Sequence, residues 1–199
     1  MSTLLNKLSP SATDLIRMDH SQVLDTFHQF RSGLSAAKKE ALVNATCVSL
    51  EIHAQLEEET FYPALRELAN DIAVLEKSFP EHAEMRRLIT RLRAMTAVDP
   101  DYDTTYFELV RDVLHHVADE ETTLLPAAER LMPERLGELG AQMARRRAQL
   151  MTSRAGEIMS STMRSFPESA AVMAAGAVGA GSYLMHQAAD WVKGVGRRH

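Results

Sequence analysis

Apolar residues recur along most of the chain at the three- and four-residue spacing that places them on one face of an α-helix. No segment shows a sustained alternation of apolar and polar residues, and no Asn-Gly or Asp-Gly pair marks a hairpin turn. The pattern therefore predicts an all-α protein.

Capping and turn residues divide this pattern into five predicted helices. We expect them over residues 11–31, 35–68, 78–97, 103–131 and from Pro133 onward. Gly33 is predicted to end the first, and Ser78 with Pro80 to open or re-open the third. Because the connections are short, the first four helices should form an up-down four-helix bundle. The chain then divides into an N-terminal segment (1–10), the bundle (11–132), an additional helix (133–165) and an Ala/Gly-rich tail (166–199).

A repeat with an offset of 63 residues lies inside the predicted bundle. The segment His53-Ala-Gln-Leu-Glu57 has a counterpart in His116-Val-Ala-Asp-Glu120, and a proline follows each histidine after ten residues. Side chains four positions apart share one face of a helix, with Cβ atoms about 5–6 Å apart. Each His-x-x-x-Glu pair is therefore expected to reach one metal ion.

The other two helices of the predicted bundle each carry a histidine on an apolar stripe, His20 and His82. A single histidine of this kind is more often a hydrogen-bonded core residue, and a single His-x-x-x-Glu pair usually faces solvent. Their co-occurrence changes this balance, because burying the set without a metal costs on the order of several kcal/mol per unpaired charge. Imidazole and carboxylate donors without thiolates favour iron over a structural zinc site. The predicted metal ligands are His20, His53, Glu57, His82, His116 and Glu120, and no separate catalytic residue is assigned.

The remaining histidines are not predicted to bind metal. His115 with Asp119 has the same spacing as the repeated pair but no partner in the first half, so His116 is favoured. His28 is expected at the edge of the bundle. His186 and His199 belong to the tail.

Composition limits where the protein acts and what it binds. A net charge of -5 with scattered basic residues argues against binding to nucleic acid. Cys47 is the only cysteine, so no internal disulfide can form and a reducing compartment is expected. Residues 1–10 hold no apolar run long enough for a secretory signal. We therefore predict a cytoplasmic protein.

The tail carries no Asp, Glu, Lys or Arg from Ser169 to Ala189, a length close to that of a membrane-spanning helix. It is poor in Leu, Ile and Phe, which supply most of the free energy of membrane insertion. We favour a helix that docks on the bundle, self-associates or stays loosely ordered. Membrane contact through the tail is the less favoured alternative.

Four motifs follow one another between about residues 10 and 132. They are Asp19-His20, then His53-x-x-x-Glu57 leading to Phe61-Tyr62-Pro63, then Glu81-His82, then His116-x-x-x-Glu120 leading to Leu124-Leu125-Pro126. This order resembles the hemerythrin-like (HHE cation-binding) family. The resemblance implies a four-helix bundle with two non-haem irons, ligated by the four histidines of the predicted set and bridged by Glu57 and Glu120. Members of that family bind or react with dioxygen, nitric oxide or peroxide, and some are linked to iron or redox stress.

The sequence departs from the oxygen-carrying hemerythrins in two places. They have His-x-x-x-His on the third helix, where this chain has Arg86 in place of the second histidine. They have His-x-x-x-x-Asp on the fourth helix, where this chain has His116-x-x-x-Glu120. The resemblance therefore favours peroxide removal, redox turnover or nitric-oxide chemistry over reversible oxygen carriage, with catalase-like turnover left open. The alternatives are an iron storage, delivery or sensing module without turnover, and a metal-free helical interaction protein.

Overall fold

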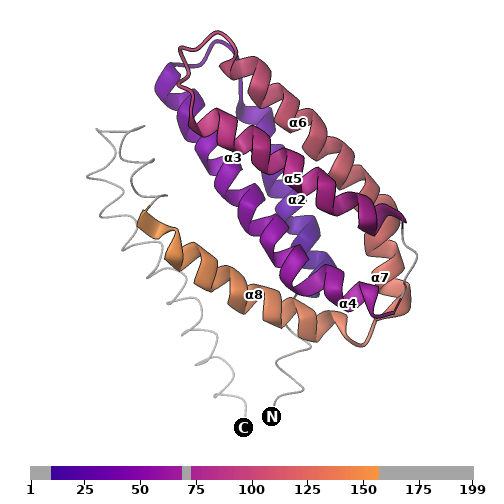
Figure 1. Ribbon diagram of the computed structural model, residues 1–199. Helices are drawn as coiled ribbons and strands as arrows, with labels where there is room; N and C mark the ends of the chain where they lie inside the picture. The colour runs from indigo at the N-terminus through magenta and orange to yellow at the C-terminus, as the bar shows by residue number, and fades with distance from the viewer. Residues whose placement is uncertain (1–9, 69–72, 157–199) are drawn as a thin grey trace.

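The computed structural model describes residues 10–68 and 73–156, and every regular element in these two ranges is helical (Figure 1). The elements are α2 (Ala12–Gln29), α3 (Ala36–Leu56), η1 (Glu57–Phe61), α4 (Tyr62–Arg66), α5 (Ala73–Arg93), α6 (Tyr102–Asp119), η2 (Glu120–Leu124), α7 (Leu125–Leu131) and α8 (Leu136–Ser153). The two η elements are single π-helical turns that join α3 to α4 and α6 to α7.

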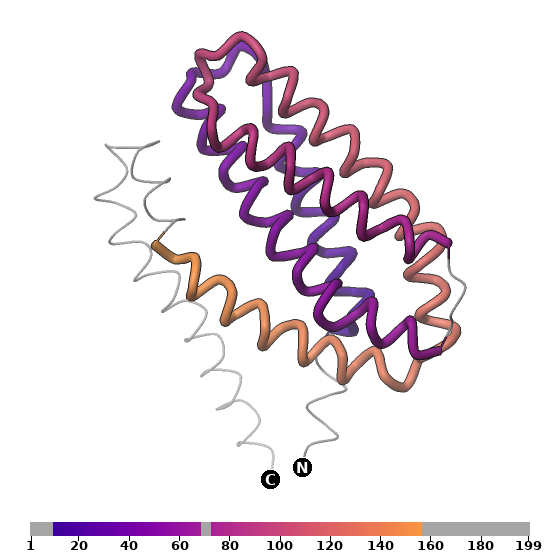
Figure 2. Tube along the Cα trace, in the orientation of Figure 1, coloured from indigo at the N-terminus to yellow at the C-terminus, as the bar shows by residue number. Residues whose placement is uncertain are grey.

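The described helices form an up-down four-helix bundle with one additional helix outside it, which confirms the predicted fold class. The four long segments of the bundle are α2, α3 with α4, α5 alone, and α6 with α7. The trace in Figure 2 shows them running side by side. Helix α8 crosses the outside of this bundle against α2 and α3. The predicted tail, 166–199, lies outside the described residues. No helix in the described part of the chain has the length and apolar character needed to cross a membrane.

The ends of α2 follow from two local interactions. Ser11 and Asp14 form a capping box, in which each side chain accepts a hydrogen bond from the other residue's backbone N–H. At the other end Phe30 is extended and turns inward against Tyr106, with ring centroids 4.4 Å apart. The helix therefore ends at Gln29, before Gly33, and the prediction that Gly33 ends it is wrong.

The predicted start of the third helix is also wrong. Helix α5 is already formed at Ala73, and Pro80 lies inside it. The Ser78 hydroxyl donates to the carbonyl of Val74 at 2.9 Å, a bond typical of a serine in a helix interior and not of an N-cap. The helix ends at Arg93, before the predicted end at residue 97.

Two π turns interrupt the second and fourth segments of the bundle, which the sequence predicted as continuous helices. Each lies just before a proline, Pro63 or Pro126, which cannot donate a hydrogen bond to the preceding turn. The backbone N–H of Tyr62 bonds instead to the carbonyl of Glu57, five residues back, and Leu125 bonds to Glu120 in the same way. The two register shifts therefore begin at the two glutamates of the repeat.

The bundle has two apolar clusters with a polar layer between them. One cluster includes Leu56, Phe61 and Leu124, and the other includes Tyr106 and Leu109, all fully buried. The predicted ligands lie where the two clusters meet. Apolar packing on both sides thus isolates this layer from solvent along the bundle axis.

Helix α8 packs very closely on the start of α2. A Cβ atom added to Gly140 would lie 2.3 Å from the carbonyl oxygen of Pro10, so only glycine fits at this crossing. Leu139, Met143 and Leu150 are buried on the same side of α8. The additional helix is thus fixed against the bundle through its backbone as well as its side chains.

Candidate metal centre

The structure brings all six predicted ligands together in the polar layer. His20, His53, His82 and His116 come from α2, α3, α5 and α6, and Glu57 and Glu120 stand where the two π turns begin. None of the six exposes more than 6% of its surface. The histidines that were not predicted to bind metal lie elsewhere: both His28 and His115 are exposed. His186 and His199 lie outside the described residues.

The six side chains form two groups. Ligand atoms of His20, His53, Glu57 and Glu120 all lie within 4.8 Å of one another, and those of Glu57, His82 and His116 form a second group of this kind. Glu57 therefore belongs to both.

Both glutamates lie between the two groups of imidazoles. The Oε2 atom of Glu57 is 3.3 Å from Nε2 of His53 and 3.4 Å from Nε2 of His82. The Oε2 atom of Glu120 is 3.2 Å from Nε2 of His20 and 3.5 Å from Nε2 of His116. The four imidazoles thus form two pairs, His20 with His53 and His82 with His116. Each carboxylate faces one imidazole of each pair, the position needed to bridge two ions.

Several buried atoms at the centre have no hydrogen-bond partner. They are Nε2 of His20 and His53, Oε1 of Glu57 and Oε2 of Glu120. Buried polar atoms are normally satisfied, and a converging set of unsatisfied nitrogen and oxygen atoms indicates a missing ion. The donor set therefore fits bound metal.

An outer carboxylate faces the Nδ1 atom of each histidine. The pairs are Glu121 with His20 at 2.8 Å, Asp19 with His53 at 3.3 Å, Glu58 with His82 at 2.8 Å and Glu81 with His116 at 2.9 Å. A carboxylate accepting from Nδ1–H fixes the tautomer in which Nε2 offers its lone pair to a metal. All four Nε2 atoms are thereby directed at the centre.

Each outer carboxylate in turn contacts a cation. The pairs are Arg17 with Glu121, Arg147 with Asp19, Arg86 with Glu58 and Lys77 with Glu81. The hydrogen bonds of Glu58 to His82 and Arg86 outweigh the opposing effect of its burial and lower its pKa to about 2. This carboxyl group is therefore ionised at neutral pH.

Tyr62 is a further polar residue at the centre that the sequence analysis did not identify. Its hydroxyl donates to the two central carboxylates, at 2.8 Å to Oε1 of Glu120 and 3.1 Å to Oε2 of Glu57. Burial raises the pKa of Tyr62 far above its usual value, so the hydroxyl keeps its proton. The available signal was a break in the repeat, because the 63-residue offset pairs Tyr62 with Leu125.

The pKa values of two groups at the centre are raised and those of two others are lowered. Burial, and then the charge of Glu120, raise the pKa of Glu57 well above its ordinary value. Burial also acts against the ionised form of Glu120, but the adjacent His20, whose Nε2 lies 3.2 Å from Oε2, outweighs it and lowers the pKa. Burial works in the same way against protonated His20, yet Glu120 raises its pKa to about 9. Burial lowers the pKa of His53 to about 4, so that imidazole is neutral.

A small cavity adjoins the four imidazoles. Its volume is about 20 Å³, enough for one water-sized molecule. Its apolar lining consists of Val23, Leu50, Ala54, Met85, Ile89, Val113 and Val117. The space beside the imidazoles is therefore small and mostly apolar.

Residues 11–128 match the family described as the hemerythrin HHE cation binding domain. The uncharacterized protein Rv2633c of Mycobacterium tuberculosis is 30% identical over 151 residues, which cover 68% of this chain and 89% of that protein. A DNA nickase of Nostoc sp. is 29% identical over 122 residues, and the match spans 61% of this chain but only 34% of the nickase.

A solved structure shares the fold. It is the crystal structure of a hemerythrin HHE cation binding domain-containing protein, the Rv2633c homolog from Mycobacterium kansasii. The TM-score is 0.64 with 21% identity, and the alignment covers 78% of this chain and 99% of that one.

Proposed function

Because this chain belongs to the hemerythrin HHE cation binding domain family, we propose that its centre holds two non-haem irons that bind or react with oxygen, peroxide or nitric oxide. The proposed ligands are His20, His53, His82 and His116, with Glu57 and Glu120 bridging. The observation that carries the proposal is the position of the two glutamates, each of which faces one imidazole of both pairs.

The donor set supports iron in particular. Imidazole and carboxylate donors suit iron, and Cys47, the only cysteine, is not part of the centre. Two anionic carboxylates between two cations lower the repulsion between them. Six protein ligands also leave coordination positions open on two irons. A small external ligand in the adjoining cavity could occupy them.

The protein's own residues would then orient the ligands and exclude water. Iron, when bound, supplies the redox chemistry. The outer carboxylates hold each imidazole in one tautomer, and the apolar lining limits the cavity to small molecules. Tyr62 keeps a proton at its hydroxyl oxygen, 2.8 Å from Glu120, where it stabilises the charge of that carboxylate.

A binding or sensing module without turnover is the second candidate. The small volume of the cavity favours this second candidate, because the cavity leaves little room for a second reactant. DNA nicking is not proposed, because the match covers only 34% of the Nostoc protein and this chain is acidic overall. A cytoplasmic location stays a prediction, based on the single cysteine.

The first prediction concerns metal content. We expect close to two irons per chain after reconstitution with ferrous iron, measured by elemental analysis of the full-length protein. His28→Ala should bind the same amount, because His28 is exposed on α2 and away from the centre. Peroxide decay by the iron-loaded protein then separates an enzyme from a binding module. A wild-type protein that retains one zinc and takes up no iron contradicts the proposal.

The second prediction concerns pH. Metal must displace the proton of His20, whose pKa is raised to about 9, so its affinity should rise with pH up to that value. Below pH 9 the rise should be about tenfold per pH unit for each proton displaced. Competition with a chelator between pH 6 and 9 measures this rise, and a metal affinity independent of pH in this range would show that no proton is displaced from His20.

A further inference from the structure

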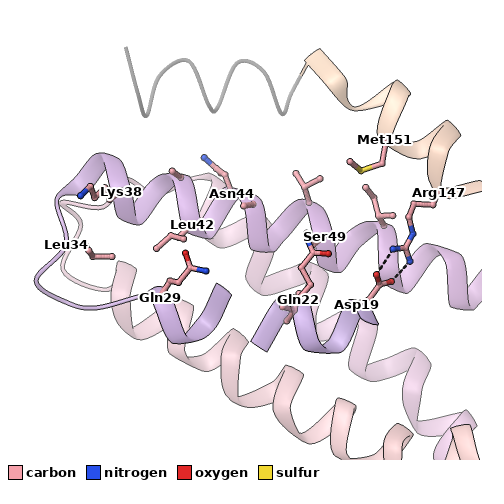
Figure 3. Close-up of a pocket in the computed structure, with 15 residues that line it drawn as sticks. Asp19, Gln22, Gln29, Leu34, Lys38, Leu42, Asn44, Ser49, Arg147 and Met151 are labelled. Carbon is pink, nitrogen blue, oxygen red and sulfur yellow. Dashed lines mark hydrogen bonds and ion pairs between the residues drawn. The ribbon is translucent and has the colours of Figure 1, made fainter. Parts of the chain in front are cut away.

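One of the four outer cations comes from outside the bundle. Arg17 belongs to α2 and Lys77 and Arg86 belong to α5, so three outer carboxylates are neutralised by the bundle's own helices. The fourth cation, Arg147, belongs to α8 and contacts Asp19 of α2 across the helix interface, as the dashed lines in Figure 3 show.

Arg147 also contacts its carboxylate differently. In three of the four pairs the histidine and the cation use different oxygens of the carboxylate; Glu58, for example, receives His82 on Oε1 and Arg86 on Oε2. The same division holds for Glu81 and Glu121.

In the fourth pair the cation shares the oxygen that faces the histidine. Arg147 forks onto Asp19, with Nη1 at 2.5 Å from Oδ1 and Nη2 bonded to Oδ2. Oδ2 is also the oxygen that faces Nδ1 of His53, at 3.3 Å. The other three carboxylate–imidazole distances are 2.8 to 2.9 Å, so this bond is the longest of the four.

We propose that Arg147 is a positioning residue of the metal centre: it holds Asp19 in place, draws its charge away from His53, and so makes the two halves of the centre unequal. A carboxylate that accepts from Nδ1–H makes an imidazole a stronger donor to metal, and a cation on the same oxygen weakens this effect. Helix α8 is then part of the centre. The inference rests on the proposed function, because it requires metal at His53.

The surroundings of the pair support this role. Asp19 and Arg147 lie at one end of a groove of about 700 Å³ between α2, α3 and α8, lined also by Val48 and Met151. Asp19 lines the small cavity beside the imidazoles as well. The side chain that contacts α8 is therefore the same one that contacts the centre, and any shift of α8 acts directly on it.

The test compares Arg147→Gln with Arg146→Gln in the full-length, iron-loaded protein. Arg146 is a matched control, because it also forks from α8 onto a carboxylate, Glu59, at 2.7 and 3.0 Å. Glu59 otherwise bonds to Gln55 and contacts none of the four histidines. Both variants thus remove one arginine and one ion pair from the same helix.

The expected result is a lower reduction potential in Arg147→Gln only. Without the arginine, Asp19 places more negative charge on His53 and stabilises the oxidised iron. We expect about a tenfold change in the ratio of oxidised to reduced protein at a fixed potential, about 59 mV for one electron. In a Mössbauer spectrum, the signal of one iron should change and that of the other should stay. Arg147→Lys, which keeps the charge but has only one nitrogen to donate to the carboxylate, should show a smaller fall in reduction potential than Arg147→Gln.

A double variant tests whether the effect passes through Asp19. Added to Asp19→Asn, the Arg147→Gln change should shift the potential no further, because the shared carboxylate charge is already gone. Equal shifts in Arg146→Gln and Arg147→Gln, additive shifts in the double variant, or equal changes at both irons would overturn the inference. If the wild-type chain takes up no iron, the proposed function itself has failed, and that result is separate.

Discussion

Replacing Glu57 or Glu120 with glutamine should remove most of the bound iron in both cases, yet change the stability of the metal-free protein in opposite directions. Glutamine matches glutamate in shape, so neither change opens a cavity. Both remove a carboxylate that faces imidazoles of both pairs, and loss of such a ligand lowers metal content and the stability of the loaded protein together.

In the metal-free protein Glu57→Gln should be neutral or stabilising. Burial raises the pKa of Glu57 well above its ordinary value, so the folded state disfavours the ionised form that the unfolded chain holds at pH 7, and this opposes folding. Glutamine removes this cost and can still accept from the Tyr62 hydroxyl. We expect a gain on the order of 1 kcal/mol in the free energy of unfolding.

Glu120→Gln should destabilise the metal-free protein. Glu120 has a lowered pKa and holds the proton on His20, so this pair contributes stability at pH 7 that the glutamine variant loses. We expect a loss of about 1–3 kcal/mol, the cost of leaving a buried polar group without its partner.

Denaturant unfolding of the metal-free variants at pH 7, with elemental analysis of the loaded ones, measures both effects. Glu59→Gln serves as the control, because Glu59 lies on the surface of the same π turn. Equal losses of stability in Glu57→Gln and Glu120→Gln would show that the proton is not held as the structure indicates.

The sequence predicted the centre well where its signal was local. The repeated His-x-x-x-Glu spacing placed two pairs on helical faces, and the 63-residue offset selected His116 over His115. The structure brings these pairs together with His20 and His82 in one buried layer.

The parts that could not be predicted depend on packing between helices. Each outer carboxylate is next in sequence to a proposed ligand but contacts a histidine of another helix, as Asp19 does with His53. Arg147 is 128 residues from Asp19, and no spacing indicates that contact. The π turns depend on where the chain redirects a hydrogen bond before Pro63 and Pro126, which helical periodicity does not show.

A long cation at position 86 can extend to the surface of the bundle or pair with a carboxylate near the centre. The structure combines the two arrangements. The side chain is 41% exposed, and its Nη2 atom donates to Glu58 at 2.8 Å. Arg86 also lines the small cavity, one helical turn after His82.

Arg86→His should slow peroxide consumption by the iron-loaded protein by roughly tenfold, the lower end of what changes around a metal centre cost. An imidazole at this position lies on the same face of α5 as His82 and can occupy a position that an external ligand needs. Arginine supplies no ligand, because its guanidinium stays protonated.

Two further variants isolate the imidazole from the lost charge. Arg86→Gln removes the cation from Glu58 without adding a ligand, and Arg87→His adds an imidazole at the neighbouring exposed position. The measurement is peroxide decay at matched iron content in all three variants and the wild type. Only Arg86→His should be markedly slower, because only it fills the open position. Equal rates in Arg86→His and Arg86→Gln would show that access to this position does not set the reactivity of the centre.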